Sequence, residues 1–154
     1  MVEKEELRNR IARIVASTRF PFIDQETWPK SRQTIVNDEV KRYAISTEVG
    51  VLYPNIVITD QDGCIREIGI IEFGEEISEK SVPRWRALSN IVPYGREFKK
   101  LFFYVPESYE EKTKQLLDDN EVNYDGIRVF MIEHQTLKII PYITRNDEYD
   151  HIIT

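Results

Sequence analysis

The fold of this chain is decided by residues 53–74, YPNIVITDQDGCIREIGIIEFG. Two apolar runs in this stretch flank the dipeptide formed by Asp62 and Gly63. An Asp-Gly pair between apolar runs is typical of a tight β-hairpin turn, because both central residues of that turn need a positive φ angle. We therefore expect strands over 55–60 and 64–74, paired as a hairpin.

The register of this hairpin determines which polar side chains can meet. With a two-residue turn at Asp62 and Gly63, Asn55 faces Ile70 across the pair. Side chains alternate along a strand, so Asn55 and Glu72 share one face as diagonal neighbours, roughly 7–8 Å apart. Two oxygen ligands at that separation can converge on one Mg²⁺ ion. A three-residue loop would instead move Asn55 to the opposite face and abolish the site.

Each of these polar residues also has a structural interpretation. Asn55 follows Pro54, and an asparagine there is often the first residue of a strand rather than a ligand. Glu72 ends an apolar run, where a carboxylate buried without a partner is costly, so a functional and a structural role are equally open. Glu48, on the preceding predicted strand, either joins the site or lies at the surface.

The rest of the pattern predicts an α/β fold with a mixed central sheet flanked by helices. Apolar spacing and capping residues predict helices near 4–17, 82–90 and 108–118, with Ser81 and Ser108 at the starts of the last two. Further strands are expected at 43–51, 98–105, 127–132 and 137–143.

Two local patterns refine this prediction. In the helix near 82–90, helical periodicity directs Trp85 and Leu88 towards the sheet and leaves Arg84 and Arg86 nearer to solvent. Residues 34–40 fit either a short helix or the approach to the first strand.

Composition is typical of a single globular domain. The chain has 154 residues, 41% hydrophobic and 31% charged. We expect one domain over 1–154, with a core at about 43–140, an N-terminal helix and loop over 1–42, and a loose polar tail over 145–154. No apolar run reaches the ~20 residues of a membrane span, and the charged N-terminus lacks the apolar core of a signal peptide. A single cysteine excludes an internal disulfide, so a reducing cytoplasm is the expected setting.

The charge balance and the small number of histidines each weigh against one kind of function. The net charge is −6, whereas a non-specific nucleic-acid binder usually carries a basic field. The chain has two histidines, His134 and His151, so neither a histidine-rich metal site nor a histidine-based catalytic triad is expected. DNA binding is disfavoured by charge without being excluded.

These residues and their order resemble the PD-(D/E)xK nuclease superfamily, which has the restriction-endonuclease-like fold. In that family an aspartate follows a proline on one core strand, an acid-x-lysine triplet ends the next strand, and a helix then packs on the sheet. Here Pro54 and Asn55 match the first motif, with asparagine in place of aspartate. The triplet Glu72-Phe73-Gly74 matches the second, with glycine in place of lysine.

The resemblance extends to a group of small, uncharacterised prokaryotic members of the superfamily. They share a tryptophan-bearing helix and a Tyr-Val-Pro segment that opens the next helix. In this chain those features are Trp85 and Tyr104-Val105-Pro106, and the similarity spans about residues 43–140.

The resemblance implies a Mg²⁺ site formed by Asn55 and Glu72, with a lysine that orients or deprotonates the attacking water. Asparagine supplies only a neutral oxygen, which weakens the binding of a hard cation, and Gly74 supplies no charge at all. Some members take the lysine from a neighbouring helix, and the arginines available there stay protonated and are poor bases. Lys80 is therefore the predicted catalytic partner of Glu72 if the site is active.

Three functions are consistent with the sequence. The leading hypothesis is a nuclease-like domain with an eroded metal site, non-catalytic or weakly active, in a DNA-linked or partner-binding role. The second is a Mg²⁺-dependent DNA endonuclease that uses Glu72, Asn55 and Lys80. The third is a small interaction protein with no nucleic-acid role, bound to another protein or to a second copy of itself. No association with a membrane is expected.

Overall fold

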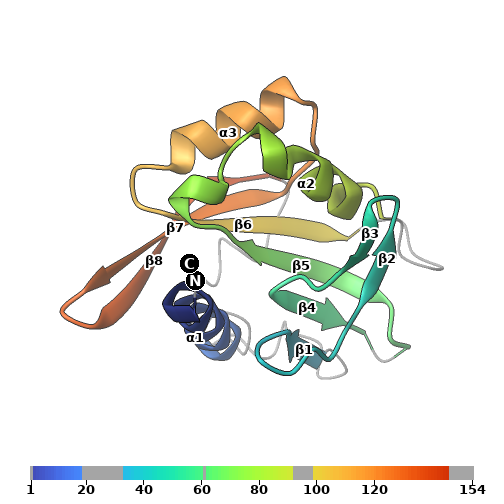
Figure 1. The fold of residues 1–154 in the computed structure, drawn as a ribbon, viewed down its shortest axis with the longest axis horizontal. Coiled ribbons are helices and arrows are strands. Elements are labelled where there is room, and N and C mark those ends of the chain that lie inside the picture. Colours follow the sequence, from blue (N-terminus) through green and yellow to red (C-terminus); the bar gives the residue numbers. More distant parts are fainter. Residues whose placement is uncertain (1, 19–32, 61, 92–98, 146–154) are drawn as a thin grey trace.

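The computed structural model describes residues 2–18, 33–60, 62–91 and 99–145, and these residues form three layers (Figure 1). Within the described residues, a six-stranded mixed sheet has the order β1-β4-β5-β6-β7-β8. Its strands are β1 (Gln33–Val36), β4 (Ile56–Thr59), β5 (Ile65–Ile71), β6 (Lys100–Pro106), β7 (Gly126–Glu133) and β8 (Thr136–Thr144). The predicted α/β class, with a mixed sheet flanked by helices, is confirmed. Residues 19–32 of the predicted N-terminal helix and loop, and residues 146–154 of the predicted tail, lie outside the described residues.

The direction of the strands explains where the helices lie. Strands β5, β6 and β7 are parallel neighbours, whereas β1, β4 and β8 pair antiparallel to their neighbours. Each parallel pair needs a crossover connection, and crossovers place helices on the face of a sheet. The helices are α1 (Val2–Thr18), α2 (Val82–Ser89) and α3 (Glu110–Asp119).

Two hydrophobic cores cover the two faces of the sheet. Helix α1 packs on one face through Ile11 and Val15, as its apolar spacing predicted. Helices α2 and α3 pack on the other face, through Trp85 and Leu117 among others. Strand β6 is buried from Leu101 to Val105, as expected for a strand covered on both sides. Of the described helices, none is long and apolar enough to cross a membrane.

The register of the predicted hairpin is confirmed, although its geometry near the turn differs from the prediction. Strands β4 and β5 pair with Val57 opposite Ile68, as a two-residue turn would require. Nearer the turn, Thr59 pairs with Ile65, so that Arg66 is an extra residue in a β-bulge.

The bulge compensates for a longer connection. The N–H of Asp60 donates to the carbonyl of Cys64 at 3.0 Å, so the connection between the strands is one residue longer than predicted. A one-residue slip would send every side chain of the strand to the other face. The bulge reverses that slip. Asn55, directly before β4, therefore still points towards the face of the sheet on which Glu72 lies.

The single strand predicted over 43–51 is wrong. The chain forms two short strands there, β2 (Ile45–Thr47) and β3 (Gly50–Leu52), which pair with each other as a separate two-stranded sheet. Gly50 has a φ of 117°, and the Thr47 hydroxyl accepts from the N–H of Val49. Glycine tolerates this backbone conformation and so permits the tight turn. The ambiguous segment 34–40 contains β1, an edge strand.

Two predicted helix caps are also corrected. Ser81 precedes α2, but its hydroxyl donates to the carbonyl of Glu76 at 2.5 Å instead of capping the helix. Ser108 lies before the start of α3 with a φ of 83°, and the residue at the cap position is Tyr109, whose side chain makes no capping bond. Both helices are held by their packing on the sheet, which outweighs the missing caps.

Burial of Trp85 gives the first testable consequence of this packing. The side chain is fully buried and makes an edge-on contact with Phe103, with ring centroids 5.2 Å apart. Trp85→Ala should therefore lower the free energy of unfolding by about 3–5 kcal/mol in urea denaturation. Pro83→Ala, at an exposed position of the same helix, is the matched control and should change it by less than about 1 kcal/mol. Equal effects of the two substitutions would contradict the packing.

Candidate functional site

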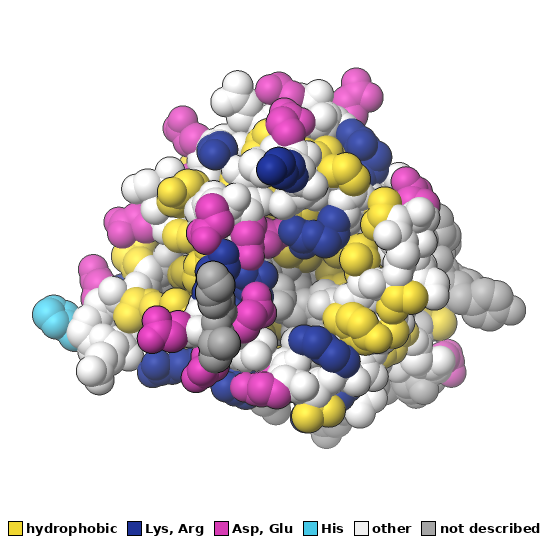
Figure 2. All heavy atoms as spheres, viewed as in Figure 1, with side chains coloured by type: hydrophobic (Ala, Val, Ile, Leu, Met, Phe, Trp, Pro, Cys, Tyr) yellow, Lys and Arg dark blue, Asp and Glu magenta, His cyan; other side chains and the backbone are white. Residues whose placement is uncertain are grey.

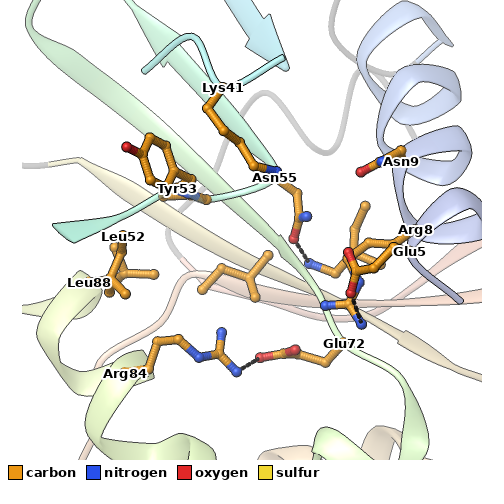
Figure 3. A pocket seen from close by; sticks show the side chains of 13 residues that line it. Glu5, Arg8, Asn9, Lys41, Leu52, Tyr53, Asn55, Glu72, Arg84 and Leu88 are labelled. Carbon is orange, nitrogen blue, oxygen red and sulfur yellow. Dashed lines mark hydrogen bonds and ion pairs between the residues drawn. The ribbon is translucent and has the colours of Figure 1, made fainter. Parts of the chain in front are cut away.

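A cavity of about 150 Å³ lies where the carboxyl end of β5 meets the start of β4. It brings together side chains from α1, from the loop before β2, from α2, from the end of β3 and the segment that leads into β4, and from the end of β5 (Figure 3). Asn55 and Glu72 both line it, as the register of the hairpin predicted. The residues in its wall are Glu5, Arg8, Asn9, Lys41, Leu52, Tyr53, Pro54, Asn55, Ile70, Ile71, Glu72, Arg84 and Leu88.

The side-chain oxygen of Asn55 is engaged by the backbone. Its Oδ1 accepts a hydrogen bond from the N–H of Ile71 at 2.8 Å, just past the last β4–β5 backbone pair (Figure 3). Its own carbonyl accepts from the N–H of Asn37 at 3.0 Å. Asn55 therefore continues the pairing of the two strands by means of its side chain. This is the structural role left open by the sequence, and it uses the oxygen that a cation would need.

Glu72 is buried, with 1% of its side chain exposed. One carboxylate oxygen, Oε2, accepts from Arg84 Nη2 at 2.7 Å and from Trp85 Nε1 at 2.5 Å. Both donors come from α2, so the packing of that helix on the sheet delivers them to the carboxylate. The cost of burying an unpaired carboxylate is thereby avoided, because the charge is paired and hydrogen-bonded.

Protonation of Glu72 is governed by competing effects. Burial raises its pKa above the ordinary glutamate value, and the guanidinium of Arg84 and the indole N–H of Trp85 oppose that rise. Glu76 lies nearby, and its pKa is lowered: burial opposes ionisation, but the N–H of Phe73 and the guanidinium of Arg8 outweigh it. A raised pKa makes Glu72 a weaker cation ligand, because a proton competes for the same oxygens.

Lys80, the predicted catalytic lysine, is exposed and does not line this cavity. It belongs to the short 3₁₀ turn Glu79–Ser81, where its N–H donates to the Ser78 hydroxyl at 3.3 Å. Glu48, the other residue weighed for the site, lies exposed in the turn between β2 and β3.

Gly74 marks the position at which the resemblance expects a lysine, and the space beside it is occupied. A Cβ atom there would come within 2.5 Å of the ring of Tyr109. A side chain longer than hydrogen at this position therefore requires Tyr109 to move. Gly74 also lies outside the cavity that holds Asn55 and Glu72.

Sequence analysis missed Asn37, which organises one wall of the cavity. Its Nδ2 donates to the carbonyls of Tyr43 and Pro54, and its Oδ1 accepts from the N–H groups of Arg42 and Tyr43, all at 2.7–2.9 Å. One buried amide thus fastens the loop before β2 to the residue preceding Asn55. The only signal in the sequence was an asparagine directly after an apolar segment, which is too common to single out.

The neighbouring Asp38 fixes the same loop to α1. Hydrogen bonds from the N–H of Val40 and from the guanidinium groups of Arg42 and Arg13 lower its pKa to about 2. The loop presents Lys41 to the cavity, and nothing in the sequence placed that lysine at the site.

Among the described residues, no group of three or more histidine, cysteine, aspartate or glutamate side chains is placed to hold a metal ion. The charged atoms at the site form a guanidinium–carboxylate pair rather than a set of oxygen ligands. No family model, curated protein or solved structure matches the chain.

The paired state of Glu72 predicts a pH-dependent effect of Arg84→Gln. Without the guanidinium, the pKa of buried Glu72 rises further, so the folded protein binds its proton more tightly than the unfolded chain does. The resulting decrease in the free energy of unfolding is absent below the ordinary glutamate pKa. It develops as pH rises through the pKa that Glu72 has in the folded protein. Urea unfolding should show a deficit of roughly 1–3 kcal/mol at neutral pH that shrinks towards about pH 4.5.

Two controls make this measurement specific. Arg86→Gln removes a charge from the same helix without touching Glu72, and should show no such pH dependence. Adding Glu72→Gln to Arg84→Gln should abolish the pH dependence. A deficit of equal size at both pH values would show that Arg84 stabilises the fold by some means other than its pairing with Glu72.

Proposed function

We propose that this chain is a nuclease-like domain whose cation site is closed by an arginine, and that it acts by binding rather than by hydrolysis. The observation that carries the proposal is the buried Glu72 carboxylate, held at one oxygen by Arg84 and Trp85. A Mg²⁺ ion would have to displace the guanidinium, because both require the same negative charge. Arg84 is part of the chain and so supplies its positive charge permanently.

The restriction-endonuclease-like character of the fold is part of this proposal. Pro54 and Asn55 lead into β4, Glu72 directly follows β5, and α2 with its buried Trp85 packs on the sheet. This is the order of features on which the resemblance to the PD-(D/E)xK superfamily rests. The meeting of Asn55 and Glu72 at one cavity supports it further.

Hydrolysis would lack three contributions at once. Asn55 brings no charge and uses its oxygen on the Ile71 N–H. The family's lysine is replaced by Gly74, and the loss of one positioned electrostatic donor costs roughly 10²–10³ in rate. Lys80 lies away from the cavity wall. These losses act on metal binding and on transition-state charge, so they compound.

A protein partner is the kind of partner that the surface favours. On the face shown in Figure 2, acidic side chains gather over α1 and alternate with lysines and arginines, without a continuous basic field. Beside the cavity, the β2–β3 hairpin and the residue after it expose three large apolar side chains, those of Val49, Val51 and Tyr53. Exposed apolar groups next to polar ones are typical of protein–protein contacts.

The proposal predicts no Mg²⁺- or Mn²⁺-dependent cleavage of plasmid DNA by the purified protein, and no saturable heat of Mg²⁺ binding in calorimetry. Glu72→Ala, which removes the last carboxylate of the expected site, is the matched control and should behave like wild type in both assays.

Cleavage by the wild type that is lost in Glu72→Ala would establish the endonuclease instead. Lys80→Ala and Lys41→Ala would then identify which lysine serves the reaction. Binding of duplex DNA that weakens steeply with salt would show a nucleic-acid partner in place of the protein partner proposed here.

A further inference from the structure

The cavity beside Glu72 contains hydrogen-bond donors that the ion pair does not use. Arg84 bonds to Glu72 and Ser81 through Nη2, and among the described residues its other nitrogens have no hydrogen-bond acceptor. The Arg84 side chain is 37% exposed, so its unused donors are open to an acceptor-rich ligand in the cavity.

Lys41 and Asn55 add donors from the opposite wall (Figure 3). The ammonium group of Lys41 donates to the carbonyl of Asp38 at 2.8 Å, and has no carboxylate partner among the described residues. The Oδ1 of Asn55 is engaged by Ile71, which leaves its Nδ2 without an acceptor within the described part of the chain. The anchored loop described above holds Lys41 in position.

The lining of the cavity also includes apolar side chains, those of Leu52, Ile70 and Leu88. Leu52 and Leu88 lie on the side of the view opposite to Glu5 and Arg8 (Figure 3). A cavity of about 150 Å³ is of the size that accommodates one benzene-sized molecule. Its occupant therefore has about that size, with one anionic end and one apolar end.

We infer that this cavity binds a small organic carboxylate, with its charge on Lys41, Arg84 and the Asn55 amide and its apolar end against Leu52 and Leu88. Arginine suits a carboxylate because its planar group of donors matches two oxygens. An inorganic anion would leave the apolar side chains unused, and a divalent cation would be repelled by the charges of Lys41 and Arg84.

This inference goes beyond the proposed function and rests on it in one respect, that Glu72 remains paired with Arg84 and not with a cation. The experiment therefore contains no divalent metal. Loss of carboxylate binding would leave the result of Mg²⁺ calorimetry unchanged, so the two proposals can fail separately.

The probe is isovalerate, a branched monocarboxylate, titrated into ¹⁵N-labelled protein and followed by two-dimensional NMR. We expect saturable shifts of the Asn55 side-chain amide and of the Leu52 and Leu88 backbone amides, with a Kd of about 1 mM for a ligand this small. Isovaleramide has the same apolar group without charge and should bind at least about tenfold more weakly. Inorganic phosphate, which has charge without the apolar group, should also bind at least about tenfold more weakly.

Two lysine variants test whether Lys41 binds the carboxylate group of the ligand. Lys41→Gln should weaken isovalerate binding by about tenfold or more, while Lys80→Gln, at an exposed position outside the cavity, should leave it unchanged. Spectra of both variants without ligand show whether the fold is preserved. The inference is overturned if isovalerate gives no saturable shifts, if the amide or phosphate binds as tightly, or if Lys41→Gln binds like wild type.

Discussion

The structure depends on one buried charge, the carboxylate of Glu72 at the end of β5. A carboxylate removed from water is destabilising unless its charge is paired and its oxygens are hydrogen-bonded, and breaking such a pair leaves an uncompensated charge. Arg84 and Trp85 meet both requirements at a single oxygen. Their helix must therefore sit at a fixed place on the sheet. The same contacts take up the charge with which a nuclease of the resembled superfamily would hold its cation.

Fold and site share residues as a result. Trp85 is at once part of the hydrophobic core under α2 and a donor to Glu72. Asn55 likewise continues the β4–β5 pairing with the oxygen that would have bound a metal. Asn55, a polar group expected to bind a metal, therefore serves the packing of the chain. The cavity that remains is lined by Lys41 and Arg84 as well as by Glu72, and this is the basis for the carboxylate proposed as its ligand.

The mixed sheet, the helices and the position of Asn55 and Glu72 at one cavity could be predicted from the sequence, because periodicity and strand register are local properties. The strand register was predicted correctly from a two-residue turn, although the chain forms a longer loop. The extra residue Arg66 in the β-bulge restores the predicted register. No pattern of side chains in the sequence reveals such a bulge. The strand predicted over 43–51 failed because the turn at Gly50 interrupts an otherwise extended run. The pairing of Arg84 with Glu72 depends on where α2 docks, and the amide of Asn37 acts through backbone groups. Neither can be derived from spacing along the chain.

The central claim is that Arg84, and not a metal ion, neutralises Glu72. Its most direct test is a crystal structure of the protein soaked in Mn²⁺, with anomalous scattering used to locate the ion. The account predicts no anomalous peak between Asn55 and Glu72, and an Arg84 guanidinium still bonded to the Glu72 carboxylate. A peak about 2.0–2.2 Å from a Glu72 oxygen, with Arg84 turned away, would contradict it.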